Sequence, residues 1–271
     1  MARKAIIAAG MLLLACPIPA MAQPPATATA NVVDPEAVAA VRRSVAYLQR
    51  LPAFALDAEM TIDAFDQDDN PLRETHSLHY EFSAPNGLFV DWRSNGENRQ
   101  LFCNGSDVSF FLPDSGAYVT LPEEGTAGDT LIAAAEQFGI VLPLPDPYLW
   151  TIGEDDPDVV ETARALGRER IDGVETDHFV LRLGDLDWEI WIEPGKHPLP
   201  RRILITVRDD PDRPQFAASL RWNVAPRIGL GRFTFVPPAG ARRIRDDDDD
   251  EPLARDIALG SPRGGRSARS G

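Results

Sequence analysis

The chain has 271 residues, of which 44% are hydrophobic and 25% are charged, so one large or two small globular domains can form a sizeable core. Its formal net charge of −15 at pH 7 repels nucleic acid and anionic lipid headgroups, which argues against nucleic-acid binding. Of its two cysteines, Cys16 and Cys103, only Cys103 falls in the expected folded part, so no intramolecular disulfide is expected.

The first 22 residues have the pattern of a secretory signal peptide. Arg3 and Lys4 precede the apolar run 5–15, and the small-x-small motif Ala20-Met21-Ala22 follows, where we expect cleavage. Removal of this segment takes the formal charge from −15 to −17, because Arg3 and Lys4 are lost. No other long apolar run is present, so we expect a periplasmic protein whose mature chain has no transmembrane segment.

A second processing pattern lies inside the same segment. Leu13-Leu14-Ala15-Cys16 fits a lipobox, and cleavage before Cys16 would leave a lipid-anchored protein. We favour cleavage after Ala22, because Pro17 directly follows the cysteine.

Residues 23–33 are rich in proline, alanine and threonine and are expected to form a linker. A helix is expected from Asp34 to Arg50, since Asp34 is a suitable N-cap and Pro35 suits the first turn. Its apolar residues recur at three- and four-residue steps, which predicts one buried face: Val38, Val41, Val45 and Leu48.

From Phe54 onward the apolar residues alternate with polar ones, which is typical of half-buried antiparallel strands. Short turns separate these runs, and Asn104-Gly105 and Asp172-Gly173 favour tight hairpins. We expect ten or eleven strands in a meander, and a sheet of that size curls because strands twist. The fold class is therefore mainly β (α+β), with a strongly curved antiparallel sheet.

Two segments interrupt this pattern. Residues 126–139 have a helical apolar face, and the proline-rich apolar run 140–150 is expected to cover one face of the sheet. The acidic run 246–251 and the Gly/Ser/Arg-rich end predict a disordered tail over 244–271. The folded domain is therefore expected to span 34–243.

The sequence contains no recognisable catalytic, phosphate-binding or metal-binding motif, so we expect no enzyme, no catalytic residue, no metal and no cofactor. His76 and His79 lie three apart on an expected strand and point to opposite faces. All four histidines, these two with His178 and His197, are expected to be ordinary surface or edge residues. A hydrolase would require at least two of four side chains to converge in one pocket: Asp177, His178, Asp187 and Glu189.

Apolar residues on the strand faces are the main functional signal. A wide curved sheet with one or two helices can leave a cavity lined by such residues. The candidate ligand-binding residues are Phe54, Leu56, Met60, Leu88, Val90, Trp92, Phe110, Trp188, Ile190, Phe216, Leu220 and Trp222. They predict binding or carriage of a lipid acyl chain or another hydrophobic molecule. The alternative is an envelope protein–protein adaptor or structural component in which side chains fill the core.

Three segments resemble a known group of proteins. They are QLFCNGSDVSFFLPDSGAYVTL at 100–121, WEIWIE at 188–193 with LPRRI at 199–203, and FTFVPPAGA at 233–241. They are similar to the hairpin, strand-and-return and closing segments of the LolA-like periplasmic lipoprotein carriers, and resemble most a family of predicted periplasmic proteins of unknown function. The resemblance implies an incomplete β-barrel with a helical lid over an apolar hollow, which in the carriers takes acyl chains.

Overall fold

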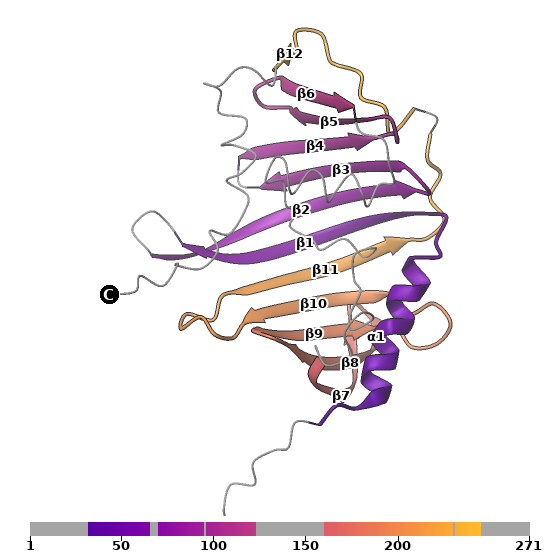
Figure 1. Ribbon diagram of the computed structural model, residues 1–271, viewed down its shortest axis with the longest axis vertical. Helices are drawn as coiled ribbons and strands as arrows, with labels where there is room; N and C mark the ends of the chain where they lie inside the picture. Colours follow the sequence, from indigo (N-terminus) through magenta and orange to yellow (C-terminus); the bar gives the residue numbers. More distant parts are fainter. Residues whose placement is uncertain (1–31, 66–69, 95, 123–159, 230, 245–271) are drawn as a thin grey trace, which may run out of the picture. The chain divides into compact units, whose positions relative to one another are not determined.

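A computed structural model describes residues 32–65, 70–94, 96–122, 160–229 and 231–244 (Figure 1). These residues contain one helix, α1 (Pro35–Leu48), and a mainly antiparallel sheet of twelve strands. The strands are β1 (Ala53–Phe65), β2 (Pro71–Ser83), β3 (Gly87–Ser94), β4 (Glu97–Cys103), β5 (Asp107–Leu112), β6 (Ala117–Pro122), β7 (Val160–Ile171), β8 (Val174–Leu183), β9 (Leu186–Ile192), β10 (Pro200–Val207), β11 (Gln215–Asn223) and β12 (Arg242–Arg243).

The helix α1 begins and packs as its sequence predicts. The Asp34 carboxylate accepts a hydrogen bond from the Glu36 N–H at 2.9 Å, and Pro35 occupies the first turn. One face is buried, formed by Ala37, Ala40, Val41, Ser44, Val45 and Leu48. The Asp34 N–H donates to the Ala163 carbonyl on β7, and the Ser44 hydroxyl donates to the Pro198 carbonyl at 2.7 Å. These bonds fix α1 beside β7 and the loop before β10.

The strand order is β12-β6-β5-β4-β3-β2-β1-β11-β10-β9-β8-β7. Strands β1 to β6 pair with their neighbours in sequence, as do β7 to β11, which confirms the expected meander. The junction between β1 and β11 joins the two series, with Leu56 opposite Trp222. The end strands β12 and β7 do not pair with each other, so the sheet is the open, curved, incomplete barrel that the sequence predicts.

Glycine permits the tight hairpins at the predicted positions. Gly105 has a φ of +85°, and the Asn104 side chain accepts hydrogen bonds from the backbone N–H groups of Ser106 and Asp107, both at 2.9 Å. At the β7–β8 hairpin, Asp172 and Gly173 have φ angles of +48° and +81°.

The alternation of each strand divides the sheet into two faces. We call the face that carries the main apolar cluster and contacts α1 the inner face; it takes in Phe54, Leu88, Ile190, Ile203 and Leu220. The opposite, outer face carries the charged residues of β1, and also Phe89, Phe102, Phe111 and Tyr118. The inner face is therefore the core of the fold.

The C-terminal strap, residues 231–244, covers part of the outer face. Its Phe235 ring contacts the rings of Phe102, Phe111 and Tyr118, with centroids 5.2, 5.3 and 5.1 Å away. At its start, Arg232 lies 3.6 Å over the Phe89 ring and pairs with Glu81 at 2.7 Å. The strap thus ties its aromatic residues to β2 through β6.

The strap ends by extending the sheet. Its strand β12 pairs in parallel with β6, and the Ile244 N–H donates to the Tyr118 carbonyl at 2.8 Å. This strand brings the total above the expected ten or eleven, because Arg242 and Arg243 show no apolar alternation. Ile244 itself, assigned to the tail from the sequence, is buried beside Ala117. Burial of this apolar side chain against Ala117 is favourable, because it removes apolar surface from water.

Several predictions lie outside the described residues. They are the signal peptide, most of the linker, the helix over 126–139, the apolar cover over 140–150 and the tail beyond Ile244. The domain boundaries at 22, 33 and 243 remain predictions.

Candidate functional site

The inner face brings the twelve candidate ligand-binding residues together in one apolar cluster. Nine are buried, and Trp188, Phe216 and Trp222 are half-buried at its border. Phe54 is fully buried, and the ring centroids of Phe82 and Trp222 each lie 5.3 Å from its own. The period-two pattern of the strands was therefore sufficient to select residues that share one surface.

This apolar cluster extends well beyond α1. The 14 residues of α1 form a helix about 21 Å long and about 10 Å wide. The eleven strands from β6 to β7 span about 50 Å at a spacing of about 4.8 Å. Because the helix is shorter than half of this span, α1 can lie over fewer than half of these strands. It is the one helix among the residues that the structure describes.

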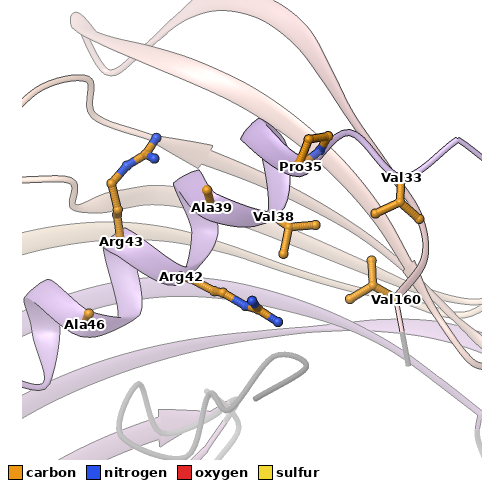
Figure 2. A pocket seen from close by; sticks show the side chains of 8 residues that line it. All are labelled: Val33, Pro35, Val38, Ala39, Arg42, Arg43, Ala46 and Val160. Carbon is orange, nitrogen blue, oxygen red and sulfur yellow. The ribbon is translucent and has the colours of Figure 1, made fainter. Parts of the chain in front are cut away.

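A pocket of about 520 Å³ opens beside α1 (Figure 2). It is lined by Val33, Pro35, Val38, Ala39, Arg42, Arg43, Ala46 and Val160. Val160 is part of the inner-face cluster and Val38 packs against it, so the pocket and the core share an apolar wall. Figure 2 shows Arg42 and Arg43 extending in different directions from the helix.

None of the twelve candidate residues lines this pocket. Most of its lining comes from the helix face next to the buried one, which carries Ala39, Arg42, Arg43 and Ala46. That pattern predicts a solvated helix surface, so the sequence offered no signal for a pocket there. Val38, predicted on the buried face, is half-buried at the edge of the pocket.

A small polar group interrupts the inner face on β2, β3 and β4. The Trp92 indole N–H donates to Nδ1 of His76 at 3.1 Å, and Arg99 lies 4.7 Å over the Trp92 ring. Arg99 also pairs with Glu97 at 2.7 Å. His76 is 3% exposed, so the prediction of a surface or edge histidine is wrong here. Burial lowers the pKa of His76 and outweighs the opposite effect of nearby Glu74.

His178 on the outer face is also buried, which contradicts its predicted surface position. Its ring stacks on Trp191 with centroids 4.0 Å apart, and its two nitrogens contact Glu169 and Glu189, each at 3.0 Å. The Trp191 indole N–H also donates to Glu169, and this bond, followed by the contact with His178, lowers the pKa of Glu169. Stacking on Trp191 of β9 shields the His178 ring from solvent.

Two of the four side chains named for a hydrolase therefore meet, namely His178 and Glu189. The other two are paired elsewhere, Asp177 with Arg168 at 2.9 Å and Asp187 with Arg182 at 2.7 Å. Within the described residues, no group of three or more His, Cys, Asp or Glu side chains could hold a metal ion.

The outer-face histidine His79 predicts a pH dependence of stability. Its Nδ1 lies 2.7 Å from Asp57 and its Nε2 lies 3.0 Å from Glu81. Burial alone would lower the pKa of His79, but the bonds to Glu81 and Asp57 outweigh it and raise the pKa. The folded state therefore binds this proton more tightly than the unfolded state, whose histidine pKa is about 6.5.

The stabilisation from His79 is complete below about pH 6.5 and is lost as the pH rises through the raised folded pKa. We expect the free energy of unfolding of the wild type, relative to His79→Gln, to fall as the pH rises above about 6.5. Urea denaturation of both proteins at a series of pH values below and above this point measures the difference in their free energies of unfolding. Parallel profiles of the two proteins would contradict a raised pKa at this residue.

The model of the predicted periplasmic protein family DUF2092 matches residues 37–245. No curated protein matches the chain. No helix among the described residues is long and apolar enough to span a membrane.

The solved structures that the chain resembles are distant from it in sequence. The lipoprotein LppX from Mycobacterium tuberculosis is 16% identical, with 72% of this chain and 100% of LppX covered and a TM-score of 0.44. LprF from Mycobacterium bovis is 15% identical, with 73% and 97% covered and a TM-score of 0.42. The LolA superfamily protein NE2245 from Nitrosomonas europaea is 10% identical, with 73% and 97% covered and a TM-score of 0.36.

Proposed function

Since this chain belongs to the DUF2092 family of predicted periplasmic proteins, and is accordingly a protein of the periplasm, we propose that it binds or carries a hydrophobic ligand there. The ligand class is a lipid acyl chain or a molecule of similar apolarity. The observation that carries the proposal is the apolar inner face, which continues across eleven strands although α1 can cover fewer than half of them.

The pocket beside α1 supplies a point of access to this face. Its wall includes Val160, which also belongs to the inner-face cluster, so an apolar chain entering the pocket contacts the core directly. A volume of about 520 Å³ is within the usual range for small-molecule sites. The guanidinium groups of Arg42 and Arg43 add positive charge beside an otherwise apolar lining.

Burial of hydrocarbon is the driving force of the proposed binding. At about 25 cal/mol per Å², hiding roughly 300 Å² of ligand surface contributes on the order of 7 kcal/mol before the ligand's ordering costs. We propose that the acyl chain packs on the twelve candidate residues of the inner face. No group on the ligand needs to react, so a carrier rather than an enzyme is proposed.

The proposal predicts that the protein purifies with a bound lipid. Native mass spectrometry after gentle extraction from the periplasm is expected to show an added mass, and the delipidated protein is expected to take up a fluorescent fatty acid. A clean apo mass together with no uptake would count decisively against a carrier.

Pocket-filling variants locate the entry site. Ala39→Trp places a large ring inside the pocket and is expected to slow or abolish uptake of the fluorescent fatty acid. Gln49→Trp is the matched control, because Gln49 is exposed at the end of the same helix and does not line the pocket. Equal uptake by the two variants would place the entry elsewhere on the inner face.

One observation favours the alternative of a protein–protein adaptor with a filled core. Nine of the twelve candidate residues are already buried within the chain itself. An adaptor would give the clean apo mass, and its partner would then bind an outer surface. The same mass measurement therefore separates the two functions.

A further inference from the structure

A polar group lies within the inner face, formed by Glu74, His76, Glu97 and Arg99 together with the indole N–H of the core residue Trp92. Its members lie on the same side of the sheet as the apolar residues, because His76 is opposite Met60 and Trp92 is opposite both Leu78 and Arg99. Met60 and Leu78 are both fully buried. Polar side chains in such a layer require hydrogen-bond partners.

The hydrogen bond from Trp92 determines which nitrogen of His76 carries a proton. An indole N–H can only donate, so Nδ1 of His76, 3.1 Å away, must be the acceptor and has no proton. In the neutral ring the proton therefore resides on Nε2. The lowered pKa of His76 agrees with a neutral ring.

The Nε2–H of His76 is buried, and among the residues that the structure describes it finds no hydrogen-bond acceptor. A carboxylate oxygen of Glu74 lies 3.2 Å from Nε2 and attracts it electrostatically, but the pair does not form a well-aligned hydrogen bond. Buried N–H donors in folded proteins are nearly always hydrogen-bonded to an acceptor. This donor is therefore available to an oxygen atom on the inner face.

The charges around His76 decide what kind of oxygen it prefers. Arg99 is neutralised by Glu97 at 2.7 Å, and Glu74 adds a further negative charge. With a neutral His76 the group carries a formal charge of −1. A carboxylate or phosphate would be repelled there, whereas an uncharged carbonyl oxygen can accept the bond.

We propose that the Nε2–H of His76 donates to the carbonyl oxygen of a neutral acyl ester, whose hydrocarbon chain lies along the inner face. This rests on the proposed function, which it narrows from apolar ligands in general to esterified acyl chains. Trp92 is a positioning residue in this arrangement, since it fixes the tautomer of His76 and orients its ring.

The test compares ligands that differ in one group. Methyl palmitate, heptadecane and palmitate compete with the fluorescent reporter N-phenyl-1-naphthylamine for the delipidated mature protein at pH 8. One hydrogen bond predicts that methyl palmitate displaces the reporter at about fivefold lower concentration than heptadecane. His76→Phe is expected to remove this difference, while His79→Phe, on the outer face of the same strand, is expected to keep it.

A second variant tests the charge argument without altering the core. Glu74→Gln keeps the shape of a half-exposed side chain and removes its charge. It is expected to tighten the binding of palmitate and to leave methyl palmitate unchanged. If His76→Phe does not fold, Glu74→Gln still tests the inference.

The outcomes distinguish this inference from the proposed function. If neither the reporter nor any competitor binds, the carrier function fails, and this inference with it. If heptadecane and methyl palmitate bind equally to the wild type, only the role of His76 is overturned. Tighter binding of palmitate than of its ester to the wild type would overturn the preference for a neutral group.

Discussion

Phe54→Ala is expected to lower the free energy of unfolding by about 3–5 kcal/mol, the range for removal of a buried phenylalanine ring. Phe54 is fully buried at the junction of β1, β2 and β11, where its ring lies against those of Tyr80, Phe82 and Trp222. Truncation leaves a cavity that rigid strands on both sides cannot close. Urea denaturation measures the loss as a lower midpoint at constant slope.

Phe54→Leu is the control for this prediction. It keeps an apolar side chain of intermediate volume, so the expected loss is about 1–2 kcal/mol. A loss below about 1 kcal/mol for Phe54→Ala would show that the ring is not packed at the centre of the inner face.

Phe235→Ala is expected to lower the free energy of unfolding by about 2–3 kcal/mol, less than for a fully buried ring because Phe235 is half-buried. Its three aromatic contacts attach the middle of the C-terminal strap to the outer face. We also expect faster amide hydrogen exchange in β6, since β12 pairs with β6 only while the strap is docked.

Val236→Ala separates this effect from a general sensitivity of the strap. Val236 is 78% exposed, so its truncation is expected to change the free energy of unfolding by less than about 0.5 kcal/mol. Equal losses for the two variants would contradict a specific role of the Phe235 ring.

Local patterns were sufficient for most of the fold. Asp34 and Pro35 predicted the start of α1, and the dipeptides at Asn104 and Asp172 predicted two hairpins, because caps and tight turns depend on a few adjacent residues. The junction of β1 with β11 could not be predicted. The sequence patterns of several strands were equally compatible with pairing to β1. Packing of the whole inner face is what selects β11.

The candidate site was predicted only in part, for the same physical reason. Alternation identified the twelve apolar residues that share the inner face, since the side of a strand is a local property. It missed the pocket beside α1 and misplaced His76 and His178. Their burial depends on Trp92 and Trp191, which lie on the neighbouring strands, 16 and 13 positions further along the chain, so each histidine's own strand carries no sign of them.

The pairing of β1 with β11 has a consequence for export. It joins residues as far apart as Glu59 and Arg221, which are separated by 162 positions, and it adds the half of the inner face that Trp222 and Leu220 carry. Contacts between such remote positions form late, because closing the intervening chain costs entropy first. While the C-terminal half of the chain is still crossing the inner membrane, the part that has already crossed cannot complete the apolar inner face.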